Sequence, residues 1–259
     1  EIFGVTTVLT SLCLVPLALA RVTGNPQTRK SPPLLVKTFM RSPLAGFGIV
    51  VNGLLFGASW SLIPRYGQQV GVVEAQIGVL MLLVSLGTLA FQWPLGWISD
   101  RRDRRKAILL SSIVGCVAAL TIAVTRASGA MLFPLVLVFG GFSMPLYSLS
   151  IAMMNDQLDR DEMVHAAGAI IVYYGIGSAT GPLIGGLFMS RFGPAGLFYV
   201  MALALALLIL FALLRVRIVP KLPKVRKRAY RIYPRSSAAA FSLLRRVKRP
   251  RVRRTGRGD

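Results

Sequence analysis

Residues 77–106 read IGVLMLLVSLGTLAFQWPLGWISDRRDRRK. The first 22 of these residues carry no charged side chain, and five Lys and Arg residues follow within 101–106. A run of about 20 apolar residues is long enough to cross the roughly 30 Å hydrocarbon core of a bilayer as an α-helix. The stretch therefore predicts a membrane-spanning helix that ends in a short, strongly basic turn.

The same pattern recurs along the chain, which is 54% hydrophobic and only 15% charged over 259 residues. Soluble globular proteins average about 25% charged residues. A removable secretory signal is a poor interpretation of the first apolar stretch, because no basic residue precedes it and further stretches follow. The sequence thus predicts an all-α polytopic membrane protein. Seven spans without Asp, Glu, Lys or Arg are expected, at 2–20, 44–63, 77–98, 107–125, 130–152, 164–188 and 195–214.

Positively charged residues collect in alternate connections between these spans. The connections at 21–43 and 99–106 hold five Lys and Arg residues each, whereas the second, fourth and sixth connections hold one each. The connection at 155–163 is weaker support, with one base among four acidic residues. Because cytoplasmic loops are enriched in Lys and Arg, these three connections are predicted to face the cytoplasm. The C-terminus is then also cytoplasmic, in a multi-pass protein of the plasma (inner) membrane.

The basic turn carries a motif, Gly96-Trp97-Ile98-Ser99-Asp100-Arg101-Arg102-Asp103-Arg104-Arg105. It resembles the loop signature G-x-x-x-D-R-x-G-R-R that follows the second helix of each half in the major facilitator superfamily. Asp103 is a departure, since the family usually has Gly there for a tight turn. The resemblance implies a secondary active transporter that moves a small solute by alternating access. It also implies a gating loop that joins two halves on the cytoplasmic side in one state, formed by Gly96, Asp100, Arg101, Arg104 and Arg105.

Elementary chemistry suggests a role for each of these side chains. Gly96 would let two helices approach closely. Asp100, at a helix end, can pair with Arg104 one turn further on. The four bases Arg101, Arg104, Arg105 and Lys106 would reach anionic lipid headgroups. A plain basic turn with no gating role is the alternative interpretation.

The longest connection divides the chain into blocks. It contains Pro26, Pro32 and Pro33, and it separates one predicted helix from six. Six helices after a long basic linker match the second half of a major facilitator transporter, which is built from inverted repeats. We therefore expect the last helix of an N-terminal bundle at 1–20, a cytoplasmic linker at 21–43, a six-helix bundle at 44–214 and a basic tail at 215–259. The expected partners are the lipid bilayer, a small-molecule substrate and the N-terminal half of the same transporter.

Two further stretches resemble one branch of the superfamily, the YcaD-like branch. They are Tyr147 to Ala152 followed by Asn155 to Leu158, and the small-residue helix segment from Gly175 to Gly186. The similarity covers most of 44–214, and it supplies no substrate.

Polar side chains inside the spans are candidates for a substrate cavity, because polar groups turn away from lipid. Helix-to-helix hydrogen bonding is the alternative role for many of them. Trp60 and Trp93, near predicted span ends, are interpreted as interfacial anchors. The cavity candidates are Asn52, Ser59, Gln92, Tyr147, Ser150, Tyr173 and Tyr174.

Glycines spaced four apart predict close contacts between helices. They occur in the span at 44–63 and again in the span at 164–188. Pro182 should bend the latter span, because proline removes a backbone hydrogen bond. The glycines concerned are Gly53, Gly57, Gly177, Gly181 and Gly185.

Nothing in the sequence predicts an enzyme, a metal site or a cofactor. The chain has one histidine and two cysteines, too few for a metal cage, and it lacks a Walker-type Gly-Lys-Ser/Thr stretch. His165 is interpreted as a solvated surface residue. The tail holds 17 of the 31 Lys and Arg residues and is expected to be disordered with incidental lipid contact, rather than to bind nucleic acid or to be an artefactual terminus. A membrane sensor or scaffold that transports nothing is the alternative function.

Overall fold

The computed structural model describes residues 11–12, 35–101, 103–158 and 163–218, with the side chains of 163–165 and 216–218 left aside. This part of the chain is helical and contains no strand. Its helices are α2 (Leu35–Arg41), α3 (Pro43–Gln69), α4 (Glu74–Arg101), α5 (Arg104–Thr125), the 3-10 turn η1 (Gly129–Met131), α6 (Leu132–Ser143), α7 (Leu146–Asn155), α8 (Met163–Phe192) and α9 (Gly196–Ile218).

Six segments of the described residues are long and apolar enough to cross a membrane, with η1, α6 and α7 together forming the fourth. They coincide with the last six predicted spans and extend several of them, most clearly α3, which continues to Gln69. The prediction of an all-α polytopic membrane fold is therefore confirmed. The predicted first helix, most of the 21–43 linker, the tail beyond 218 and the side chain of His165 lie outside the described residues.

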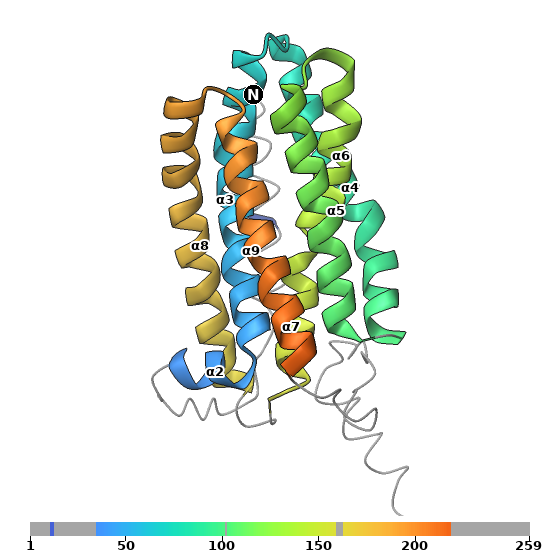
Figure 1. Cartoon of the computed structure of the whole chain (residues 1–259), viewed down its shortest axis with the longest axis vertical. Helices are drawn as coiled ribbons and strands as arrows, with labels where there is room; N and C mark the ends of the chain where they lie inside the picture. Colours follow the sequence, from blue (N-terminus) through green and yellow to red (C-terminus); the bar gives the residue numbers. More distant parts are fainter. Residues whose placement is uncertain (1–10, 13–34, 102, 159–162, 219–259) are drawn as a thin grey trace, which may run out of the picture. The chain divides into compact units, whose positions relative to one another are not determined.

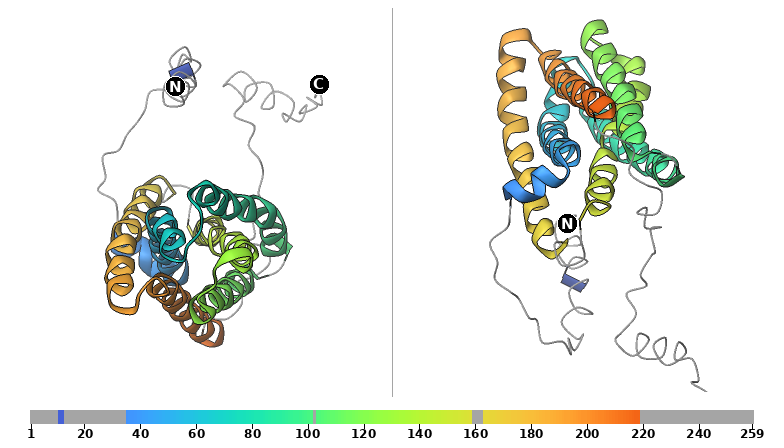
Figure 2. Two further views of the ribbon diagram at one scale, coloured as in Figure 1. Left: turned by 90° about the horizontal axis from the view of Figure 1, so that it is seen from above. Right: turned by 60° about the horizontal axis from the view of Figure 1, so that its bottom comes forward.

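The helices pack mainly in three pairs, α3 with α8, α4 with α6 and α5 with α9 (Figures 1 and 2). A cluster of buried rings joins helices from different pairs. Phe198 of α9 lies with its ring centroid 4.9 Å from that of Tyr66 and 5.9 Å from that of Phe139 on α6. The Tyr66 hydroxyl donates to the carbonyl of Ala127, 3.0 Å away, so the one polar atom of this cluster is satisfied inside the bundle.

Glycines bring α3 and α8 into backbone contact. A Cβ added at Gly53 would lie 2.3 Å from the Tyr174 carbonyl oxygen, and one added at Gly57 would lie 2.2 Å from that of Ser178. The relationship is reciprocal, because a Cβ at Gly177 or Gly181 would lie 2.0 or 2.3 Å from a carbonyl oxygen of α3. Gly185 ends the row against the side chain of Leu62. Such small-residue faces let two helices pack with their backbones touching.

A second glycine contact, between α4 and α6, is not marked by a four-residue spacing in the sequence. A Cβ on Gly87 would lie 2.1 Å from the carbonyl oxygen of Leu137, and one on Gly140 would lie 2.6 Å from that of Val84. Here each helix contributes one of these two glycines, Gly87 on α4 and Gly140 on α6, so no repeated spacing appears in the sequence. The two glycine contacts therefore hold α3 against α8 and α4 against α6.

The span predicted at 130–152 is interrupted, since α6 ends at Ser143 and α7 begins at Leu146. Pro145 has no N–H, so the helical hydrogen-bond ladder is broken here. Asn52 of α3 stabilises the interruption, because its amide nitrogen donates to the carbonyl oxygens of both Ser143 and Met144 at 3.1 Å, and Met144 also accepts from the N–H of Tyr147 at 3.4 Å. By contrast, α8 continues through Pro182 without interruption.

Candidate functional site

A cavity of about 820 Å³ opens between the two glycine-packed pairs. Residues of α3, α4, α7 and α8 line it, together with the break between α6 and α7, whereas α5 and α9 contribute none of the lining. Among the described residues, no charged side chain lines this cavity. The lining residues are Asn52, Phe56, Trp60, Val84, Ser85, Thr88, Gln92, Met144, Pro145, Tyr147, Ser148, Ile151, Ala152 and Tyr174.

Four aromatic rings form one wall of the cavity. Phe56 is central, with its ring centroid 5.7 Å from that of Trp60 and 5.8 Å from that of Tyr174. Tyr147 of α7 continues the row, 5.2 Å from Tyr174 at an interplanar angle of 64°. Edge-to-face and tilted contacts of this kind are the favoured geometries for aromatic pairs. Three helices therefore contribute to one aromatic surface.

The small polar side chains in the cavity donate their hydrogens to the backbone. The Thr88 hydroxyl donates to the carbonyl of Val84 at 2.8 Å, and the Ser85 hydroxyl to that of Met81 at 3.1 Å. Ser148 donates to the carbonyl of Pro145 at 3.1 Å. Hydroxyls on membrane helices commonly bond the carbonyl three or four residues earlier. Their oxygen lone pairs are left to accept from whatever fills the cavity.

The structure brings four of the seven cavity candidates together, namely Asn52, Gln92, Tyr147 and Tyr174. The other three lie elsewhere. The Tyr173 hydroxyl donates to the carbonyl of Leu35, so it ties α8 to α2. The buried hydroxyl of Ser150 packs against Gly48 of α3. Ser59 is buried too, and it does not line the cavity.

Helical periodicity could have found several lining residues that composition alone did not mark. Ser85, Thr88 and Gln92 are three and four residues apart on α4, and Asn52, Phe56 and Trp60 are four apart on α3, so each set shares a face. Trp60, interpreted as an interfacial anchor, lines the cavity, and α3 continues nine residues beyond it to Gln69. Trp93, in contrast, is largely exposed and lines no part of the cavity.

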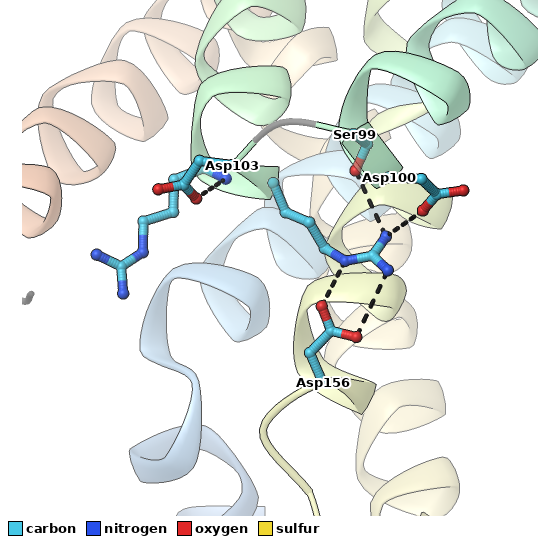
Figure 3. A network of polar contacts seen from close by, with 6 residues as sticks. Ser99, Asp100, Asp103 and Asp156 are labelled. Carbon is cyan, nitrogen blue, oxygen red and sulfur yellow. Dashed lines mark hydrogen bonds and ion pairs between the residues drawn. The ribbon is translucent and has the colours of Figure 1, made fainter. Parts of the chain in front are cut away.

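At the end of the bundle where α4 meets α5, the basic turn forms a cluster of ion pairs (Figure 3). Arg104 lies with its Nε 2.5 Å from Oδ2 of Asp156 and its Nη2 3.5 Å from Oδ1 of the same carboxylate. The predicted local pair is also present, with Arg104 Nη1 3.1 Å from Oδ1 of Asp100. The Arg104 and Asp156 side chains are only 11% and 14% exposed, whereas Asp100 is 48% exposed. Arg104 therefore joins the turn to the end of α7.

This geometry corrects one expectation for the loop. Arg104 and Arg105 were expected to reach lipid headgroups, but Arg105 is buried and Arg104 pairs with Asp156. The attraction between two opposite charges is stronger where the pair is shielded from water. Arg101 does lie at the surface, where its guanidinium stacks 4.2 Å over the ring of Trp97. Gly96 was expected at a close helix contact, and that stays a prediction, because no described atom comes within 4 Å of a Cβ added there.

Asp103, the departure from the loop signature, has a helical role. Its φ of −74° and ψ of 122° are ordinary extended values, so the position does not require glycine. Its carboxylate accepts from the backbone N–H of Arg105 at 3.1 Å and thereby caps the start of α5. An aspartate here also suits the positive end of the helix dipole.

Comparisons with known proteins agree with this architecture. The family model described as Major Facilitator Superfamily matches residues 45–253. An uncharacterised MFS-type transporter of Yersinia pestis is 30% identical over 206 residues, which covers 78% of this chain and 52% of that protein. The uncharacterised MFS-type transporter YcaD of Salmonella heidelberg is 27% identical over 208 residues, with the same coverage of 78% and 52%. The chain thus spans about half the length of these relatives.

The bundle also resembles a solved transporter in shape. The POT family transporter PepTSo, known from an in meso crystal structure, superposes with a TM-score of 0.61 at 19% identity, covering 71% of this chain and 39% of that one. At this identity the likeness concerns the fold alone. Six apolar helices, the loop motif between α4 and α5 and the matched family model therefore lead to one conclusion. The chain belongs to the major facilitator superfamily, and it is a multi-pass membrane protein similar to the YcaD-type relatives.

Proposed function

We propose that this chain forms the C-terminal half of a secondary active transporter that carries a small organic solute across the plasma (inner) membrane by alternating access. The solute is moved without chemical change. The observation that carries the proposal is the cavity of about 820 Å³ that lies between the α3–α8 and α4–α6 pairs. Its volume lies within the range of about 300–1,000 Å³ typical of small-molecule sites.

The exposed surfaces of α4 and α8 support a second half as the partner. In the most apolar 18-residue segment of each helix, only 17% of α4 and 28% of α8 is buried inside the bundle, compared with 67% of α3. Both helices also line the cavity, so a partner that covers them would close its open side. An N-terminal half of the same transporter would have the matching inverted-repeat architecture.

The ion-pair cluster suggests how the two halves communicate. Arg104 and Asp156 are shielded and hold the turn to α7, whereas the half-exposed Asp100 keeps a carboxylate oriented outward. We propose that Asp100 contacts the opposite half when the cytoplasmic side is closed. A contact present in one state only shifts the balance between the two states.

Accessibility of the cavity from the two sides of the membrane tests the transporter function. On a cysteine-free background, Thr88→Cys places a thiol in the cavity, and Lys106→Cys places one at the exposed basic turn. An impermeant thiol reagent is applied to right-side-out and to inside-out vesicles that contain the complete transporter. Alternating access predicts labelling of position 88 from both sides and of position 106 from the cytoplasmic side only. Labelling of position 88 from one side alone would favour a static sensor or scaffold.

A further inference from the structure

We propose that the cavity takes amphipathic organic amines, molecules with a flat apolar body and an amino group that donates hydrogen bonds, and that it discriminates against carboxylates and phosphates. The proposal rests on the transport function above and adds the substrate class. Three independent features of the lining support it: ring faces, lone pairs and the placement of charge.

The aromatic wall contributes four connected rings to the lining. Phe56, Trp60, Tyr147 and Tyr174 form one connected surface, with successive centroids 5.2–5.8 Å apart. The face of an aromatic ring carries the negative end of its quadrupole, so it attracts an ammonium group and repels an anion. The same rings provide a broad apolar surface against which a flat body can stack.

The small polar groups present acceptors. Ser85, Thr88 and Ser148 each donate their single hydroxyl hydrogen to a backbone carbonyl, and Asn52 donates its amide hydrogens to Ser143 and Met144. Hydroxyl oxygens and the Asn52 Oδ1 therefore remain as acceptors. An occupant with N–H groups pairs with these oxygens, whereas a carboxylate or phosphate has only lone pairs to offer them.

The charged groups of the bundle lie away from the lining. The Arg104 guanidinium, which could otherwise attract an anion, is paired with Asp156 and Asp100 at the end of the bundle. In the part of the chain that the structure describes, every donor that remains in the lining is neutral, as in Gln92, Trp60 and the two tyrosines. An anion that entered this wall would lose hydration without meeting a cation, which is costly in an apolar site.

Three probes that share one ring system test the class. They are 1-naphthylmethylammonium, the neutral 1-naphthalenemethanol and the anionic 1-naphthoate. Binding to the purified 259-residue chain in nanodiscs of zwitterionic lipid is measured by equilibrium dialysis, with empty nanodiscs subtracted. The ammonium is expected to bind about tenfold or more tightly than the naphthoate, with the alcohol between them. Naphthoate binding as tightly as the ammonium would overturn the proposal.

Two variants assign the binding to the cavity. Trp60→Ala should weaken binding of the ammonium about fivefold or more. The matched control Trp93→Ala removes the same side chain from an exposed site outside the cavity and should change nothing. Phe56→Leu keeps apolar volume but removes a ring face, so it should weaken the ammonium more than the alcohol.

Equal effects of the Trp60 and Trp93 variants would refute the site, since they would show that the probes bind the exposed surface. Absence of binding above empty nanodiscs for all three probes would refute the amine class. Neither result would alter the labelling of position 88 from both sides of the membrane, so failure of the substrate class can be distinguished from failure of the transporter function.

Discussion

The guanidinium of Arg104 lies 2.5 Å from the carboxylate of Asp156, so the first residue of α5 is joined to the residue that follows α7. The two residues are 52 positions apart in the sequence. Both are largely shielded from water, and Arg104 also contacts Asp100. The cluster thereby links the connections at 99–106 and 155–163, which were both expected on the cytoplasmic side. Within it, Arg104 and Asp156 form a shielded pair, whereas the carboxylate of Asp100 is half exposed.

Two double-mutant cycles that share Arg104 should separate these roles. The cycle of Arg104→Gln with Asp156→Asn should give a coupling of about 1–3 kcal/mol in the free energy of unfolding, because the pair is shielded and charge-assisted. The cycle of Arg104→Gln with Asp100→Asn should give about 0.2–0.5 kcal/mol, since Asp100 is half exposed. Unfolding in mixed micelles with increasing SDS measures both. Equal couplings would show that shielding by the bundle does not strengthen the Asp156 pair.

Asp100→Asn should alter function more than folding. Arg104 keeps Asp156, so insertion and unfolding of the variant should be close to those of the parent. In the complete transporter, loss of a charge-assisted contact worth roughly 1.5–3 kcal/mol should shift the ratio of states toward inward-open by about one to two decades and reduce turnover. Distances between spin labels across the cytoplasmic face report the populations. Unchanged distances and turnover would leave the loop as a topological anchor only.

The glycine contact between α3 and α8 can be tested with two substitutions on one helix. Gly177→Ala places a Cβ 2.0 Å from the carbonyl oxygen of Val50 and should destabilise the bundle by about 1–3 kcal/mol, because backbone must move. Gly175→Ala meets nothing within 4 Å and should be neutral or stabilising by up to about 1 kcal/mol. Thermal unfolding in detergent compares the two. A Gly177→Ala variant as stable as Gly175→Ala would contradict the close approach.

Asn52 should stabilise the interruption of the fourth span. Asn52→Leu keeps similar volume but removes the Asn52 donor from the carbonyls of Ser143 and Met144 and leaves Met144 with only the N–H of Tyr147 at 3.4 Å, at a cost of about 1–2 kcal/mol. Thr121→Val on α5 removes a hydroxyl that bonds only within its own helix and lies on an exposed face, so it should cost less than about 0.5 kcal/mol. Unfolding in detergent provides the comparison, and equal costs would mean that the break does not need Asn52.

The proposed orientation predicts which side of the membrane bears the basic turn. A single cysteine at position 106, on a background without Cys13 and Cys116, should react with an impermeant reagent only after the cytoplasmic side is opened. A cysteine at position 126, in the fourth connection, should react in intact cells. Efficient labelling of position 106 from outside would reverse the assigned topology.

The sequence by itself determined where the chain crosses the membrane and which family it resembles. Whether a segment crosses the membrane depends on the free energy of transferring about 20 consecutive residues into hydrocarbon, and the composition of that segment is enough to predict it. The loop motif is likewise a local pattern, so it marked Asp100 and Arg104 correctly as neighbours. The four-residue glycine spacing also marked the face of α3 that meets α8.

Tertiary structure decided which side chains share a site. Asp156 became the partner of Arg104 because the start of α5 meets the end of α7, and no local pattern spans the 52 residues between them. Ser59, Ser150 and Tyr173 are as polar as the lining residues, yet helix rotation turns them elsewhere. Pro145 interrupts its span while Pro182 does not, and the interruption coincides with the place where Asn52 of another helix donates to the carbonyls of Ser143 and Met144. Since an unpaired carbonyl is costly in lipid, the position of such a break depends on a neighbouring helix and not on the proline alone.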